Sequence, residues 1–234
     1  MYILEGNIGA GKSTFLKLIE DRYPFINTIQ EPHDNWKKQS YGQSLLADFY
    51  SNPKRWAYTI ETLAMSCRIR DHLKNKNLKV TTIMERSVYS GHHCFAYNGF
   101  LSGFMTNLEW AIYCRWFDFL VGKKHITPQG FIYLQTTPPI SYERIKRRSR
   151  PEEKAMTLEY LEQMHKRHEE FLLLKKNASS AIKKVPVLVI NCDKEFETNK
   201  LQTHKMFDAL EKFLNQTQGS GIPAITKEQY HESL

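Results

Sequence analysis

The clearest chemical pattern lies at residues 6–13, where the chain reads Gly-Asn-Ile-Gly-Ala-Gly-Lys-Ser. It fits GxxxxGK[ST], in which glycines let backbone N–H groups turn toward phosphate oxygens. An apolar run precedes it and a helical one follows, so phosphates would meet a helix N-terminus. Lys12 is expected to contact the β- and γ-phosphates, and Ser13 to ligate Mg²⁺. The expected nucleotide contacts are Gly6, Asn7, Ile8, Gly9, Ala10, Gly11, Lys12, Ser13 and Thr14.

A phosphate loop indicates nucleotide binding but does not identify what receives the phosphate. Two further groups follow predicted strands. The second predicted strand ends in Gln30-Glu31-Pro32, and Glu85 and Arg86 follow the run 80–84. Ligands of open α/β sheets bind at the carboxyl ends of the strands. We therefore expect Glu31 as a candidate base, Glu85 as a Mg²⁺ or proton-handling carboxylate, and Arg86 as a phosphate-binding guanidinium.

Short β-branched or apolar runs alternate with longer amphipathic ones, which predicts an α/β fold. The expected strands are 2–5, 26–30, 80–84, 131–135 and 185–190, forming one parallel sheet with helices on both faces. Pro53 and Pro138 mark helix starts, since proline is tolerated in the first turn. Residues 1–216 are expected to form one domain, and residues 217–234 a flexible tail with Gly-, Ser- and Gln-rich composition.

The bulk composition leaves several protein classes open. The 234 residues carry a formal net charge of +8, which suits nucleic acid, a membrane surface or a polyanionic substrate. The four cysteines have neither zinc-site nor paired extracellular spacing, and no apolar run approaches the roughly 18 residues that span a bilayer. With no apparent leader at Met1, a cytoplasmic protein with no membrane or nucleic-acid partner is expected.

With these motifs in place, the chain resembles the deoxyribonucleoside kinase family, which includes deoxycytidine, deoxyguanosine, mitochondrial thymidine and insect multisubstrate kinases. The resemblance runs almost end to end, and its motifs keep the family's order and spacing. They are residues 5–15, Glu31-Pro32 with Trp36, Arg55-Trp56 leading to Arg68-Ile69-Arg70, residues 85–90, and residues 148–153 followed by 158–161.

The resemblance implies a phosphate-loop kinase fold that transfers the γ-phosphate of ATP, with Mg²⁺, to the 5′-hydroxyl of a deoxynucleoside for salvage. Glu31 takes the place of the family's general base, while Glu85 is the other contender and would help to hold Mg²⁺. Arg86 would orient the 5′-oxygen and the transferring phosphate. Family members are usually homodimers, joined through helices corresponding to residues 45–70 and 107–121.

The resemblance also implies contacts along the rest of the substrate. Tyr50 and Glu153 match the pair that binds the sugar 3′-hydroxyl, whereas Trp36, Phe49 and Phe95 match residues around the base. An arginine-rich lid at about residues 147–153 would close over ATP and neutralise developing charge. Further ATP contacts implied by the resemblance are Arg144, Arg148, Arg150, Glu195 and Phe196.

At the base site the chain departs from the family. Glu61 replaces the usual glutamine, and an ionised carboxylate accepts hydrogen bonds but cannot donate them, unlike an amide. Arg68 lies seven residues further on, on the same helix face, and Gly91 replaces an aspartate that pairs with this arginine in the cytidine and purine kinases. We expect broad specificity or a preference for thymidine and deoxyguanosine.

Three other functions compete with this assignment. A nucleoside monophosphate kinase would need an extra cationic site, a non-catalytic structural member of the fold would not need the chemical residues, and a nucleic-acid binder would use the positive charge. The pairs His92-His93 and His165, His168 suggest a metal, but no carboxylate or cysteine completes a set, which favours ordinary polar positions.

Overall fold

The computed structural model describes residues 1–31, 44–124 and 127–217. Its centre is an all-parallel sheet of five strands in the order β2-β3-β1-β4-β5. The strands are β1 (Tyr2–Gly6), β2 (Asn27–Ile29), β3 (Thr82–Glu85), β4 (Gly130–Gln135) and β5 (Val187–Asn191). The predicted fold class is confirmed, and each strand lies within about two residues of its predicted place.

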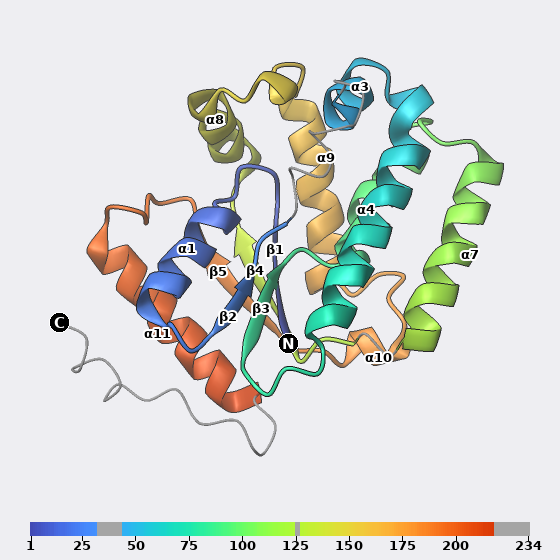
Figure 1. The fold of residues 1–234 in the computed structure, drawn as a ribbon. Helices are drawn as coiled ribbons and strands as arrows, with labels where there is room; N and C mark the ends of the chain where they lie inside the picture. Colours follow the sequence, from blue (N-terminus) through green and yellow to red (C-terminus); the bar gives the residue numbers. More distant parts are fainter. Residues whose placement is uncertain (32–43, 125–126, 218–234) are drawn as a thin grey trace.

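Alternate residues of the central strands supply two separate cores, because successive side chains of a strand point to opposite faces. Leu4 packs with Phe15 and Leu210 on one face, whereas Ile3 packs with Met84 and Phe171 on the other. Helices α1 (Lys12–Arg22) and α11 (Lys200–Thr217) cover the first face, and α4 (Pro53–Asn75), α7 (Asn107–Lys124) and α9 (Leu158–His168) lie on the second (Figure 1).

The remaining helical segments of the described chain are shorter and connect these layers. They are α3 (Leu45–Ser51), α5 (Val88–Ser90), the π-helix η1 (Gly91–Ala96), α6 (Tyr97–Leu101), α8 (Pro138–Arg148), the 3-10 turn η2 (Pro151–Glu153), the π-helix η3 (Glu169–Leu173) and α10 (Ser180–Lys183).

Local chemistry explains where the helices begin. Pro53 and Pro138 occupy first turns as predicted, since their missing N–H groups would have had no partner there. The range 45–70 that the resemblance assigns to the dimer contains two helices, α3 and the first part of α4, which Asn52 separates. The Asn52 side chain accepts from the Arg55 N–H and caps α4, while its backbone lies outside the helical region.

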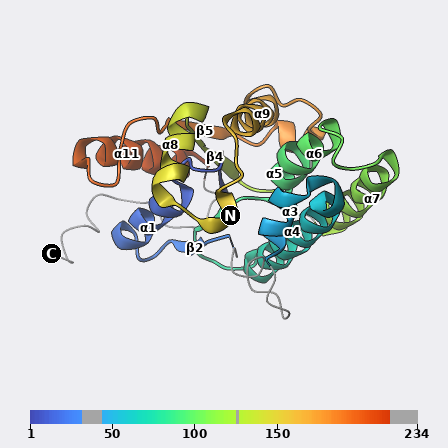
Figure 2. The ribbon, with the colours of Figure 1, turned by 90° about the horizontal axis from the view of Figure 1, so that it is seen from above.

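Because the sheet is parallel, the carboxyl ends of all five strands lie at the same edge of the domain (Figure 1). Seen from above in Figure 2, α8 lies on the α1 side and α3 and α9 lie on the α4 side. The lid segment at about 147–153 follows α8 directly, so it adjoins the strand ends rather than the opposite edge. Residues brought to this edge come from both halves of the sequence.

Two terminal features complete the fold. Helix α11 ends at Thr217, whose hydroxyl lies 2.8 Å from the Tyr2 hydroxyl. Residues 218–234 of the predicted flexible tail, like Trp36, lie outside the described residues. Among the residues described, no helix is long and apolar enough to cross a membrane.

Candidate active site

The phosphate loop joins β1 to α1, as the sequence predicted. Gly9 and Gly11 have φ values of 78° and 93°, a region that side chains rarely adopt. A Cβ at Gly9 would lie 2.5 Å from the Ser141 carbonyl oxygen, and one at Gly11 would lie 2.7 Å from the Phe196 ring. Glycine is therefore required at both positions by backbone conformation and by close packing.

Lys12 points back into the loop and is nearly fully buried. Its Nζ donates to the Asn7 carbonyl oxygen at 2.9 Å and lies 3.9 Å from Oε1 of Glu85. Burial lowers the pKa of Lys12 to about 7, and the nearby Arg86 cation adds to this effect. A phosphate anion would restore the lysine charge by attraction, so the site favours binding a polyanion.

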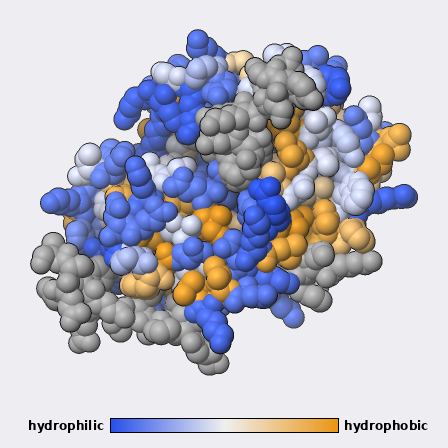
Figure 3. Space-filling view, in the orientation of Figure 1, coloured by the Kyte–Doolittle hydropathy of each residue, from blue (hydrophilic) through white to orange (hydrophobic). Residues whose placement is uncertain are grey.

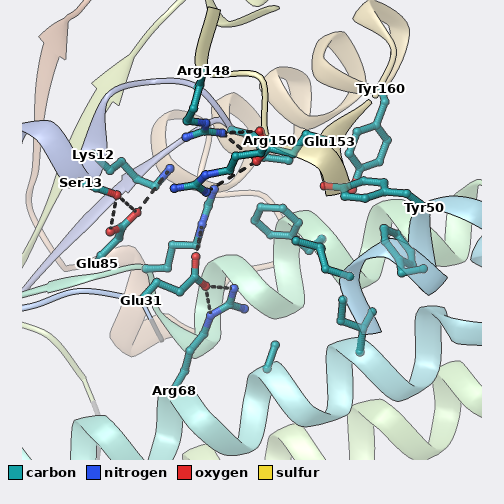
Figure 4. Close-up of a pocket in the computed structure, with 18 of the residues that line it drawn as sticks. Lys12, Ser13, Glu31, Tyr50, Arg68, Glu85, Arg148, Arg150, Glu153 and Tyr160 are labelled. Atoms are coloured by element: carbon teal, nitrogen blue, oxygen red, sulfur yellow. Dashed lines mark hydrogen bonds and ion pairs between the residues drawn. The ribbon is translucent and has the colours of Figure 1, made fainter. Parts of the chain in front are cut away.

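Ser13, at the start of α1, and Glu85, at the end of β3, meet beside Lys12 (Figure 4). The serine hydroxyl donates to the two glutamate oxygens at 3.1 and 3.4 Å. Both groups offer hard oxygen ligands, which Mg²⁺ prefers together with phosphate oxygens and water. The residues expected to hold the metal are therefore adjacent and chemically suited to it.

Glu31 follows β2 and is held by two arginines in the interior. Arg68 donates to Oε1 through Nε at 3.1 Å and Nη2 at 2.5 Å, while Arg86 donates from Nε to Oε2 at 3.1 Å. All three side chains are at most 6% exposed. Charge-assisted bonds in a low dielectric are strong, so the carboxylate has a defined position.

Arg86 links this carboxylate to the phosphate loop. Its backbone has φ of 61°, unusual for a residue other than glycine, and its N–H donates to the Leu4 carbonyl oxygen at 2.9 Å. The guanidinium Nη1 donates to the Gly6 carbonyl oxygen at 3.0 Å, and Cζ lies 4.5 Å from the centre of the Phe95 ring. Such strained backbone is typical of functional sites.

The resemblance assigns one end of the pocket to the sugar and the other to the base. The end assigned to the sugar is lined by tyrosines and by residues of the segment 147–153. Tyr50 of α3 and Tyr160 of α9 lie side by side next to Glu153 (Figure 4). Arg148 donates to both Glu153 oxygens at 2.7 and 2.8 Å, and Arg150 lies 3.8 Å from Oε1. The predicted pair Tyr50 and Glu153 therefore shares one pocket with the lid arginines, and two cations face a single carboxylate.

The base end of the pocket combines apolar side chains with two charged groups from α4. Glu61 and Arg68 both line it, on the same helix face as their spacing predicted. Burial raises the pKa of Glu61 to about 7, with Arg68 opposing this and Glu31 adding to it. Phe49 and Phe95 also line the cavity, as expected.

Several predicted residues lie away from this cavity. Gly91 sits behind Arg68, since a Cβ there would be 2.6 Å from the arginine Nη1. Arg144 donates to the Cys192 carbonyl oxygen at 2.7 Å, and Phe196 packs between Phe15 and Gly11 on the outer side of the loop. Glu195 is exposed and accepts from the Thr198 and Asn199 N–H groups.

Sequence reasoning missed several residues that line the pocket: Leu46, Ile60, Ala64 and Tyr160. Tyr160 stood within the motif 158–161, but its role was not deduced. One signal was available, because Tyr160 lies one residue from the fully buried Leu161, at the boundary of the inward face of α9. The three apolar residues carry no chemical signature, so only the fold identifies them.

The histidines do not form a metal site. His92 stacks on Phe117 at 4.0 Å and His93 on Phe171 at 4.7 Å between ring centres, and burial lowers their pKa values to about 3 and about 4. Within residues 1–31, 44–124 and 127–217, no group of three or more His, Cys, Asp or Glu could hold a metal ion.

Together, the phosphate loop, the paired arginines around Glu31 and the pocket that extends from the loop to α3, α4 and α9 define a phosphate-loop kinase with a small-molecule acceptor site. A model of the deoxynucleoside kinase family matches residues 2–215. The chain therefore belongs to the deoxynucleoside kinase family, which makes it an ATP-dependent deoxynucleoside kinase.

Similar proteins span nearly the same length. Deoxycytidine kinase 2 of Gallus gallus is 36% identical over 235 residues, which cover 90% of this chain and 89% of the relative. The mitochondrial deoxyguanosine kinase of Xenopus laevis is 33% identical, with 90% and 88% covered, and deoxycytidine kinase of Homo sapiens is 34% identical, with 83% and 84% covered.

Proposed function

We propose that this enzyme transfers the γ-phosphate of ATP to the 5′-hydroxyl of a deoxynucleoside and prefers thymidine and deoxyguanosine to deoxycytidine. The observation that carries the proposal is the position of Glu31. It is buried at the junction of the phosphate loop and the acceptor pocket, bonded to Arg68 and Arg86. A sugar pointing its 5′-carbon toward the loop would bring its hydroxyl to this carboxylate.

Glu31 is assigned as the general base. Each carboxylate oxygen has two lone-pair directions, so Glu31 can accept a substrate hydroxyl while it keeps its arginine bonds. Arg86, which also holds the Gly6 carbonyl oxygen, is assigned to orient the 5′-oxygen and the transferring phosphate. Glu85 is the alternative base, but its bond to Ser13 supports a role at the metal instead.

The assigned ligands of Mg²⁺ are Ser13 and Glu85, completed by phosphate oxygens and water. When bound, the ion would neutralise charge on the β- and γ-phosphates. Arg148 and Arg150 supply further positive charge from the lid. Because they share Glu153 as counter-ion, one cationic charge remains available for the nucleotide.

The base preference rests on Glu61. As a carboxylate it accepts from the N1–H and N2–H₂ groups of guanine or the N3–H of thymine, whereas the unprotonated N3 of cytosine repels it. The pKa of Glu61 is about 7, so the carboxylate form predominates at about pH 8. The preference should be clearest at that pH.

The direct test is the steady-state rate of transfer from ATP to the four deoxynucleosides at about pH 8, with the four ribonucleosides as controls. The expected order places thymidine and deoxyguanosine above deoxycytidine, and deoxyribose above ribose. Deoxycytidine as the best substrate would contradict the base preference. Faster phosphorylation of thymidine monophosphate than of any nucleoside would contradict the acceptor assignment.

We also propose that the chain forms a homodimer through α7. In Figure 3 hydrophobic colour lies over α7 at the right-hand edge, and the exposed apolar residues of this helix are Leu108, Ile112, Trp116 and Phe119. Their spacing forms one stripe, which a second copy could cover. Trp116→Glu should halve the mass measured by light scattering, whereas Leu201→Glu, at a more exposed leucine of α11, should not. The proposal would be overturned if the Trp116→Glu variant were still a dimer or if the wild-type protein were a monomer.

A cytoplasmic location is proposed from the cysteines, because all four are free and reducing compartments keep thiols in this form. The similar Xenopus laevis kinase is named as mitochondrial. Microscopy of the full chain fused to a fluorescent protein tests the proposal, and mitochondrial fluorescence would contradict it.

A further inference from the structure

Glu61 is an unusual carboxyl group because it is buried and aimed into the substrate pocket. Its side chain lines the base end, only 9% of the residue is exposed, and Oε2 has no hydrogen-bond partner among the described residues. An ionised carboxylate in such a place loses hydration that no hydrogen bond from the described residues to Oε2 replaces. The group therefore needs either a proton or a ligand that donates.

The nearest cation on the same helix face is directed elsewhere. Arg68 Nε and Nη2 both donate to Glu31, and its guanidinium lies against the backbone at Gly91. A side chain at position 91 would occupy this space, since its Cβ would be 2.6 Å from Nη1 of Arg68. Gly91 therefore leaves room for the position in which Arg68 donates to Glu31. In this arrangement Oε2 of Glu61 has no hydrogen-bond partner among the described residues.

The other groups that act on Glu61 come from every neighbouring element. Glu31 after β2 disfavours its charge, while Arg68 of α4 and Arg86 after β3 favour it. Tyr50 of α3, Tyr113 of α7 and Tyr160 of α9 are phenols whose pKa values burial raises, so they stay neutral. Burial is the largest effect, and it brings the pKa of Glu61 to about 7.

We infer, on the basis of the proposed function, that Glu61 binds the nucleobase in two forms, as a carboxylic acid and as a carboxylate, and that the two forms select different bases. The acid has one O–H donor and one carbonyl acceptor, which is the pattern of a glutamine amide. The carboxylate only accepts. One residue therefore gives the pocket two specificities, and the proton decides between them.

The two forms differ most between cytosine and guanine. Cytosine presents N3 as an acceptor beside the N4 amino donor, which matches the acid, whereas guanine presents two adjacent donors, N1–H and N2–H₂, which match the carboxylate. A mismatched pair leaves a buried polar group without its bond. That loss corresponds to about five- to hundredfold in relative affinity.

The expected result is a fall in the ratio of kcat/KM for deoxycytidine to kcat/KM for deoxyguanosine as the pH rises. The fall should be about tenfold between roughly pH 6 and pH 8, centred near 7. Effects of pH on ATP binding or on Glu31 cancel in this ratio, because both substrates use them. In Glu61→Gln the ratio should be constant with pH, because an amide does not titrate in this range.

Glu162→Gln provides the matched control, since this residue of α9 is exposed and the substitution is chemically identical. It should keep the wild-type dependence on pH. A constant ratio in the wild type, or an unchanged dependence in Glu61→Gln, would overturn the inference. Absence of transfer to every deoxynucleoside by the wild type would instead refute the proposed function.

A second measurement needs no variant. Binding of each nucleoside to the wild-type enzyme near pH 7 is followed by calorimetry in buffers of different ionisation enthalpy, which reports protons exchanged on binding. Binding of deoxyguanosine should release a fraction of a proton, and binding of deoxycytidine should take up a fraction of a proton. Proton exchange of the same sign for both nucleosides would contradict the inference, even if Glu61→Gln fails to fold.

Discussion

The two ends of the substrate pocket are built in different ways. At the phosphate end, adjacent residues of one loop supply backbone donors and Lys12, and Gly9 and Gly11 are required by the conformation of that loop. At the base end, Glu61, Phe49 and Phe95 come from separate helices, and the Glu61 Oε2 has no hydrogen-bond partner among the described residues. The phosphates of ATP are the same in every turnover, whereas the bases of the deoxynucleosides differ, and the unpaired carboxylate oxygen lies at the end that would meet the base.

Glu31 connects the two ends, so changing it should have the largest effect on activity. Glu31→Gln removes the proposed base and should lower kcat about 10²- to 10⁴-fold, while ATP binding persists. Single-turnover transfer and ATP titration measure the two quantities separately. Retained turnover would transfer the base role to Glu85, and Glu162→Gln on the surface serves as the control.

Arg68 gives the next largest effect, on stability. Arg68→Met removes one of the two arginines that form ion pairs with Glu31, and we expect the free energy of unfolding to fall by about 3 kcal/mol. Urea denaturation measures this value. Arg70→Met, at an exposed arginine two residues away, should change it by less than about 0.5 kcal/mol. An equal change in the free energy of unfolding for the two variants would mean that the buried ion pair stabilises the fold no more than the exposed one.

Lys12 makes the phosphate end sensitive to pH. Its pKa is about 7 in the folded chain and near 10.5 when unfolded, so the unfolded chain binds more protons between these values. Without nucleotide, stability should therefore rise with pH by up to about 1.4 kcal/mol per unit relative to Lys12→Met. Denaturation at several pH values tests this, and parallel curves for the two proteins would refute it.

The smallest effect is expected at Tyr113, beside the base end. Its buried hydroxyl has no hydrogen-bond partner among the described residues, so Tyr113→Phe should leave stability unchanged or raise it by up to about 1 kcal/mol. Tyr133 is the matched position, because its hydroxyl donates to Glu169 at 2.7 Å. Tyr133→Phe should cost about 1 kcal/mol in thermal or urea unfolding. Equal losses would show that Tyr113 has a partner.

Much of the fold and of the phosphate end could be predicted from the sequence. The five strands, the loop at 6–13 and the helix starts at Pro53 and Pro138 follow from periodicity and local conformational preference. The helix start at Pro53 was predicted, but the capping role of Asn52 was not, although asparagine before proline is a recognisable cap. The acceptor residues Tyr50 and Glu153 were found through a family resemblance rather than through physics.

By itself, the sequence determined the phosphate loop and the alternation of strands and helices, because those features depend on neighbours along the chain, and the order of its motifs pointed to the kinase family. Only the tertiary structure decided that Arg68 binds Glu31, that Tyr160 lies beside Tyr50, and that Glu61 is buried enough to have a pKa of about 7. Burial and charge depend on residues far apart in sequence. The physical reason is that the dielectric and the partners of an ionisable group are properties of the folded chain.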